Sequence, residues 1–453
     1  MFKKILSGGF FLTTLLLLDA AKATTLKETV IVSLETNPSI SADEAAARAS
    51  DFQIDAARSG YFPSIDLFGS AGRQYTRIDD RNVPPLSFPI NGSATRNVTN
   101  PVISLRQNIF DGMATPFAVA QAHALEQQAL STLGQTKEQI AFTAVSAHAN
   151  LYAQQALLEV YEESIKKHEE ILEQVKKRVA GGVSTIADVD QVLSRLEQAR
   201  VIKERTEGEL EAAIADYIAV TDFQPQKVRT PAFTRDLFSD SLDSILARVY
   251  KNNPTVKVAI AQLEVAEAQF NQTLSPFLPN IRVELNANDP QLNPSGVHGK
   301  TKTYTAQVVG QYNLFSGGKD LANRQAQREK VVQAKKLLDA SWRNAKKQAS
   351  AAYARLLSAD EQIAELDTAV DVNKKLTREY ELQFTLVSLP IPFLLDAYVS
   401  YYSSKSDLIN QEAQEVVNYA LVLASMGALV SYFQPATVCK PCEDEDDDDE
   451  GPC

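Results

Sequence analysis

The sequence predicts a mostly α-helical protein with paired β-strands, built from one unit that occurs twice. Two observations support this fold class. From Pro116 to Ala180 the chain has no further proline and only one glycine, and it consists largely of strong helix formers. At about 1.5 Å per residue, such a helix is roughly 100 Å long, far longer than an ordinary domain is wide. Short motifs also recur along the chain, for example Asn37-Pro38 and Asn253-Pro254, which lie 216 positions apart. Recurrence at a fixed distance indicates duplication.

The composition is that of a folded protein. The 453 residues are 44% hydrophobic and 23% charged. Much of the formal net charge of −12 comes from an acidic run at 443–450, so the remaining chain is only mildly acidic, and no basic face suggests nucleic acid. The three cysteines, Cys439, Cys442 and Cys453, all lie near the C-terminus. The fold of the body therefore depends on no disulfide.

The first 23 residues have the pattern of a secretory signal peptide. Lys3 and Lys4 precede an apolar run, and Ala21-Lys22-Ala23 is a small-x-small cleavage site. After this segment, no apolar run approaches the roughly 18–20 residues that a membrane-spanning helix needs. A secreted chain with very long helices indicates the envelope of a double-membrane bacterium. We expect a first repeat over 24–230, a second over 231–433, and a tail over 434–453.

Each repeat is expected to contain a long helical hairpin. From Ile140 onward, apolar positions alternate in steps of four and three, which is a heptad seam. Gly181-Gly182-Val183 interrupts this helix, and the segment from Ile186 resumes it, so the first hairpin covers 112–221. The second hairpin is expected over 317–432, with its turn at 386–393.

A strand pair is expected before each hairpin, over about 64–110 and 281–315. The predicted strands are 64–72, 98–110, 281–288 and 303–315. In the third, Ile281, Val283 and Leu285 alternate with Arg282 and Glu284. This period of two is typical of a transmembrane barrel strand, and equally of a soluble sheet with one buried face. Four such strands, each joined directly to a very long helix, favour the membrane.

Four strands cannot close a barrel, and an open edge in lipid leaves backbone groups unpaired at several kcal/mol each. Eight strands leave an interior filled by side chains, whereas twelve leave room for a channel. We therefore expect a homotrimer.

The duplicated plan resembles the TolC-like outer-membrane efflux proteins over essentially all of residues 24–433. The matching features are the two Asn-Pro sites, the two Pro-x-Ile strand starts, the two Phe-x-Gly turns and the Asp-containing hairpin turns. The resemblance implies a trimer that forms a 12-stranded β-barrel on an α-helical periplasmic tunnel. It implies a location in the outer membrane that extends into the periplasm, with contact to outer-membrane lipid. It also implies two partners, a periplasmic adaptor (membrane fusion protein) and an inner-membrane transporter.

In this family the tunnel closes at the periplasmic hairpin tips. Aligned on the turns, Asp188 and Asp396 keep the acidic positions that ring the entrance. Such a ring favours cations. The alternative, which the residues alone favour, is that each aspartate is a helix-start residue stabilised by the macrodipole.

The second turn departs from the family. Val387, Leu389 and Phe393 stand where relatives place Gly, Arg and Asp, and Phe384 replaces a Tyr. The usual polar latch partners are missing. One hypothesis is therefore an apolar constriction that gates the channel by dewetting. Phe393 is its first candidate residue, and Leu389 and Phe384 are the others. The alternative is that Phe393 only packs between coils.

Adaptor docking in relatives uses the outer face of these tips. The residues at the corresponding positions here are Gly181, Gly182, Val183, Leu386, Val387 and Ser388. The first three match the family well and the last three match it poorly, so the partner is expected to differ from the adaptors of drug pumps.

We expect no catalytic site, metal or cofactor. The four histidines stand in no HExxH or triad context. The tail is interpreted as a flexible acidic segment with a Cys439–Cys442 disulfide, the alternatives being a cation site or pairing through Cys453. The expected function is the exit duct of a tripartite efflux or type I secretion system. A periplasmic coiled-coil adaptor is the alternative, and an enzyme is a distant third. The cargo stays open.

Overall fold

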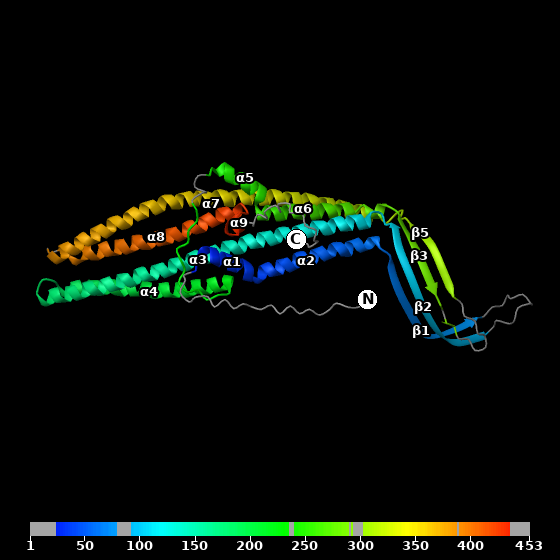
Figure 1. The fold of residues 1–453 in the computed structure, drawn as a ribbon, viewed down its shortest axis with the longest axis horizontal. Coiled ribbons are helices and arrows are strands. Elements are labelled where there is room, and N and C mark those ends of the chain that lie inside the picture. Colours follow the sequence, from blue (N-terminus) through cyan, green and yellow to red (C-terminus); the bar gives the residue numbers. More distant parts are fainter. Residues whose placement is uncertain are drawn as a thin grey trace, which may run out of the picture.

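A computed structural model describes residues 24–78, 92–234, 240–289, 291–292, 302–386 and 389–434. Long helices run side by side along the molecule, and a sheet extends from one end of them (Figure 1). The predicted signal peptide and the cysteine-containing end of the tail lie outside the described residues, so the expectations for them stay predictions.

The two repeats share a succession of elements, to which the second adds the short strand β4 and the short helix α9. The first consists of α1 (Leu26–Thr36), α2 (Pro38–Arg58), a 3-10 turn (Ser59–Tyr61), β1 (Ser64–Ile78), β2 (Gly92–Phe110), α3 (Ala114–Ala180) and α4 (Ile186–Thr221). The second consists of α5 (Leu242–Asn252), α6 (Pro254–Gln272), a 3-10 turn (Ser275–Phe277), β3 (Asn280–Asn288), β4 (Gln291–Leu292), β5 (Thr303–Gln311), α7 (Lys319–Leu386), α8 (Ile391–Ser425) and α9 (Leu429–Phe433).

The predicted strands differ from the observed ones in length. β1 and β2 extend beyond the predicted 64–72 and 98–110, because their backbones keep pairing outward as far as Ile78 and Gly92. The strand predicted over 303–315 ends at Gln311. The return arm of the second hairpin also does not run unbroken to Tyr432. Gly427 takes φ +62°, a left-handed conformation that glycine adopts without strain, and this separates α8 from α9.

The strands form one antiparallel sheet in the order β1-β2-β3-β5, and β4 pairs with β2. The register places Leu67, Ile103, Ala287 and Tyr304 in one cross-strand row. Side chains that share a row lie on the same face of the sheet. One face is therefore apolar across all four main strands, as the alternation predicted. The opposite face carries polar residues such as Glu284, which accepts hydrogen bonds from Arg282 Nε (2.7 Å) and Gln307 Nε2 (3.0 Å).

The helices form a wall in which each packs against its neighbours. Near the sheet the order is α2-α3-α6-α7, and in the other half it is α4-α3-α8-α7. One edge of the wall is therefore α2 and α4, and the other edge is α7. The edge strands agree with this order, because α2 leads into β1 and β5 leads into α7. Sheet and wall thus have their two open edges on the same two sides.

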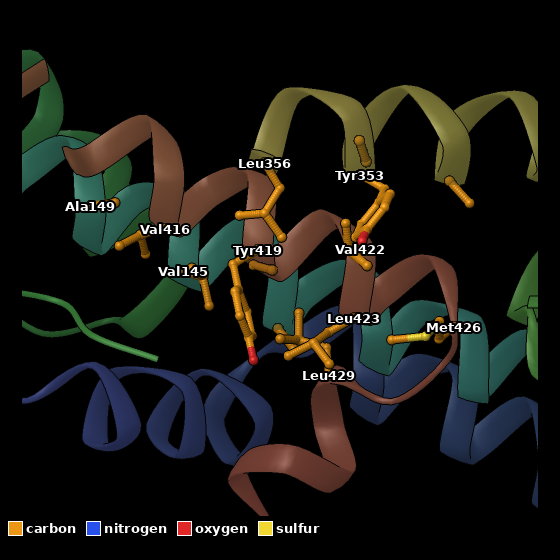
Figure 2. Close-up of a cluster of buried hydrophobic side chains, with 14 of the residues drawn as sticks. Val145, Ala149, Tyr353, Leu356, Val416, Tyr419, Val422, Leu423, Met426 and Leu429 are labelled. Atoms are coloured by element: carbon orange, nitrogen blue, oxygen red, sulfur yellow. The ribbon is translucent and has the colours of Figure 1, made fainter. Parts of the chain in front are cut away.

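The core lies where the helices near the sheet, α2 and α6, meet the helices of the other half, α4 and α8. Figure 2 shows Val145 of α3, Leu356 of α7, Tyr419 of α8 and Leu429 of α9 converging there. The Asn253 amide donates to the Ser425 carbonyl (2.8 Å), and its Oδ1 accepts from the Val256 N–H (3.1 Å). This Asn-Pro site therefore caps α6 and ties it to the end of α8.

Candidate functional site at the hairpin tips

The first hairpin turns within a few residues. Gly181 caps α3, and Gly182 has φ +75°, so the chain reverses without strain at a position that favours glycine. Thr185 and Asp188 then form a capping box at the start of α4. The Thr185 N–H donates to the Asp188 carboxylate (2.8 Å), and the Asp188 N–H donates to Thr185 Oγ1 (3.3 Å). Asp188 is thus placed as a helix-start residue, with its carboxylate engaged locally.

The second hairpin joins α7, which ends at Leu386, to α8, which begins at Ile391 after Pro390. Phe393 lies in the first turn of α8 and is 55% exposed within the chain, whereas Leu389 is half-buried. Phe393 therefore does not pack into the protomer's own core. Leu386 and Val183 are also strongly exposed. The predicted docking residues Val387 and Ser388 lie outside the described residues.

Among the candidate gate residues, Phe384 lies buried inside the chain. Its side chain is only 3% exposed and belongs to an apolar cluster under the tips. This tip cluster consists of Val160, Ile171, Leu172, Val175, Val192, Leu196, Phe384, Ile391, Leu394, Leu395, Tyr398 and Tyr402. The Arg178 guanidinium lies over the Phe384 ring at 4.4 Å and donates to the Phe384 carbonyl. Phe384 thus joins the two hairpins inside the protomer.

Asp396 makes the polar link between the hairpins. Its Oδ1 lies 3.1 Å from a guanidinium nitrogen of Arg195, on α4. A second ion pair joins Lys405 of α8 to Glu163 of α3 at 2.7 Å. Two ion pairs therefore join the hairpins within the chain, and neither uses the turn positions at which the family's usual polar partners are missing.

His168 lies buried between α3 and α8. Its Nδ1 donates to the Ser164 carbonyl (2.7 Å), and its Nε2 is buried with no hydrogen-bond partner. Its ring faces Tyr398, with the ring centroids 6.3 Å apart. Burial lowers the pKa of this imidazole, and the charge of Arg195 lowers it further. The tip interface therefore holds a neutral histidine at neutral pH.

Sequence reasoning found the turns and missed the partners. Arg178, Arg195 and Glu381 looked like ordinary surface charges of long helices. The Tyr398 hydroxyl donates to the Glu381 carboxylate, and Lys167 lies 4.0 Å from the same carboxylate. Arg178 and Arg195 contact residues 206 and 201 positions away, and no local motif marks such contacts. The one local signal is His168, a polar residue that falls between Ile165 and Leu172 in the four-three alternation that starts at Ile140.

Within the described residues, no helix is both long and apolar enough to cross a membrane. Nor does any described group of three His, Cys, Asp or Glu side chains have the geometry to hold a metal ion.

Solved structures with this arrangement are outer-membrane channels. The Campylobacter jejuni CmeC outer membrane channel superposes with a TM-score of 0.78 and 12% identity, covering 89% of this chain and 85% of that one. The open state of the Neisseria gonorrhoeae MtrE outer membrane channel gives 0.75 and 16% identity, covering 89% of each chain. At such identities these structures show the fold alone.

The profile of the outer membrane efflux protein family matches residues 32–216 and 245–425, one stretch in each repeat. The chain belongs to this family. It is 21% identical to the outer membrane efflux protein BepC of Brucella suis over 363 residues, which cover 80% of this chain and 76% of that one. It is 23% identical to protein CyaE of Bordetella pertussis over 321 residues, covering 69% and 65%. The chain is therefore an outer-membrane efflux channel that extends into the periplasm, and it is not an enzyme.

Proposed function

We propose that three copies of this chain form a 12-stranded barrel on a helical periplasmic tunnel, which opens and closes at the hairpin tips. The observation that carries the proposal is the pair of open edges. β1 and β5 each lack a partner on one side among the described strands, and α2 with α4 and α7 are the corresponding edges of the wall. A neighbour that continues the sheet at β5 also continues the wall at α7. Membership in the efflux channel family disfavours the adaptor alternative.

Assembly follows from the cost of the open edges. Each backbone group left unpaired in lipid costs several kcal/mol. Continuing β5 of one copy with β1 of the next removes both edges and keeps the apolar face outward. Three copies supply twelve strands, the smallest number of these units that leaves an aqueous interior. The polar face with Glu284 then lines the lumen.

The tips are proposed to be the gate. Phe393 and Asp396 are exposed on the same helix, α8, so neighbouring copies can bring three of each to the axis. An apolar ring of Phe393, with Leu389 behind it, resists wetting, and Asp396 adds an acidic ring above it. The Asp188 carboxylate is held in the α4 cap, so Asp188 contributes little to the gate beyond its charge.

The exposed outer residues of the tips, Gly181, Gly182, Val183 and Leu386, together with Val387 and Ser388, are proposed to dock a periplasmic adaptor that connects the channel to an inner-membrane transporter. Val183 is 63% and Leu386 79% exposed, which leaves apolar area free for a partner. The cargo, whether a small molecule or a secreted polypeptide, follows from the transporter rather than from this chain.

The test combines mass and conductance. Light scattering on the detergent-extracted protein, corrected for detergent, is expected to give three chains per particle. In planar bilayers Phe393→Ala is expected to raise the resting conductance, and Val201→Ala, on an exposed part of α4, is the control. A monomer that stays in solution without detergent contradicts the barrel, and an unchanged conductance contradicts the apolar gate.

A further inference from the structure

The outward face of β1 changes character along its length. Ile65, Leu67, Gly69 and Ala71 alternate on the apolar face, and the next residues on this face are Arg73, Tyr75 and Arg77. All three of these later side chains are exposed. Arg73 has no ion-pair partner among the described residues, whereas Arg77 already makes an interaction within the chain. The apolar face of β1 therefore begins with side chains that are compatible with lipid. It ends with the guanidinium groups of Arg73 and Arg77 on either side of the Tyr75 phenol.

The neighbouring strand supports the same change. Across the register from Arg73 lies Asn97, and across from Tyr75 lies Thr95, so β2 offers uncharged hydrogen-bonding groups at this height. No position of β1 or β2 on this face, outward of the apolar stretch, carries a carboxylate. Among the described residues, the nearest carboxylate in register is that of Asp289, whose N–H donates to the Pro101 carbonyl opposite Gly69 (3.3 Å), four residues short of Arg73. Along the chain, Asp79 and Asp80 follow the end of β1 directly.

The height of the stripe matches the border of a bilayer. Nine residues separate Ser64, the first residue of β1, from Arg73, about 30 Å along the strand. At a strand tilt of about 40° this gives a rise of roughly 23 Å, close to the height of about 25 Å of the apolar band of outer-membrane barrels. At the opposite border, Tyr61 and Phe62 are exposed just before β1, where aromatic residues mark the membrane–water interface.

We propose that Arg73, Tyr75 and Arg77 form a headgroup site that binds the phosphate groups of outer-leaflet lipids. Guanidinium groups bind phosphate through paired, charge-assisted hydrogen bonds. The Tyr75 hydroxyl and Asn97 amide add donors for neutral parts of the headgroup, while the apolar stretch below contacts the acyl chains. The inference rests on the proposed insertion of this sheet into the outer membrane. Beyond that function, it specifies which chemical group of the surrounding lipid the channel binds.

The test measures lipid binding to the full, detergent-extracted protein by native mass spectrometry. The probes are bisphosphorylated lipid A and the same lipid with its phosphates removed. Wild type is expected to bind the phosphorylated probe more tightly, and each arginine is expected to contribute about five-fold. The variant R73Q/R77Q is expected to lose about 20- to 30-fold on the phosphorylated probe alone, whereas R73K/R77K keeps most of the preference. The control R106Q removes an arginine from the opposite face and is expected to bind like wild type.

The outcomes separate this inference from the channel itself. If R73Q/R77Q stays trimeric, conducts, and binds both probes like wild type, the headgroup site is wrong and the channel proposal stands. If inorganic phosphate at millimolar concentration displaces the lipid, the site takes phosphate in general and the assignment to lipid is overturned. If wild-type protein is washed from vesicles by urea, the membrane insertion fails and the inference fails with it.

Discussion

Apolar packing, more than ion pairing, is expected to hold the two hairpins together at the tips. Phe384→Ala removes a ring that is almost fully buried in the tip cluster, and such truncations cost about 3–5 kcal/mol. Asp396→Asn removes an ion pair whose side chains are 39% and 66% exposed, and such pairs contribute about 0.2–1 kcal/mol. Since every 1.4 kcal/mol is about tenfold, Phe384→Ala shifts the opening equilibrium by about a hundred-fold or more, and Asp396→Asn by at most about five-fold.

Amide hydrogen exchange measures this difference directly, because amides released by local opening exchange in proportion to the open population. The informative segments are 171–180 of α3 and 391–402 of α8, on the two sides of the tip cluster. Phe384→Ala is expected to speed exchange in both segments, and Val201→Ala, which truncates an exposed residue of α4, in neither. If Asp396→Asn loosens the tips as much as Phe384→Ala does, the apolar cluster is not what holds the hairpins closed.

Three further predictions concern the region where the helix pairs meet. Burial raises the pKa of Glu138 to about 7 from 4.5, although its carboxylate accepts N–H bonds from Leu429 and Val430. The folded state therefore binds more protons, and stability falls by about 3 kcal/mol as pH rises from about 4.5 to 7. Denaturant titrations at several pH values are expected to show this slope in wild type and not in Glu138→Gln. Burial lowers the pKa of His148, so the pH dependence that this residue gives to the free energy of unfolding is opposite to that of Glu138. The stabilisation by neutral His148 is present above pH 6.5 and is lost as pH falls below it. His148→Gln is expected to remove this loss. Gly427→Ala places a Cβ 2.5 Å from the Asn252 carbonyl in a left-handed backbone, and is expected to lower stability by at least about 1–2 kcal/mol in the same titrations, with Gly208→Ala as the control.

The repeating architecture was predictable because its signals are local and periodic. The Asn37-Pro38 and Asn253-Pro254 sites indicated the duplication, and in each repeat two helices meet at this site. Alternation in 281–288 predicted which face of the sheet is apolar. Strand ends were less predictable, since a strand continues for as long as its neighbour pairs with it. β1 extends to Ile78 because Gly92 and its neighbours continue the ladder, and turn-like composition there does not prevent it.

The tip contacts were not predictable because they join residues distant in sequence. Arg195 and Asp396 are 201 positions apart, and Arg178 and Phe384 are 206 apart. Their contact depends on the axial position of α8 relative to α3. The heptad pattern does not fix this position, because a shift by whole turns still brings apolar positions to face each other. Phe384 became a gate candidate because it stands, near the turn, where relatives place a Tyr. A helix residue near a turn still faces the neighbouring helix if its heptad position points there.

The duplication also places different chemistry at equivalent positions. His148 of α3 and Tyr353 of α7 are 205 positions apart, as are the two Phe-x-Gly turns at Phe110 and Phe315. His148 Nε2 donates to the Arg229 carbonyl (3.0 Å), and the Tyr353 hydroxyl donates to the Asp240 carbonyl (2.5 Å). Each long helix thus supplies one buried donor to the segment that connects the repeats. What the two repeats share here is a donor that satisfies a backbone carbonyl, and either an imidazole or a phenol can supply it. Comparing the residue letters of the two repeats misses this equivalence, because the physical requirement fixes the hydrogen bond and leaves the residue type free.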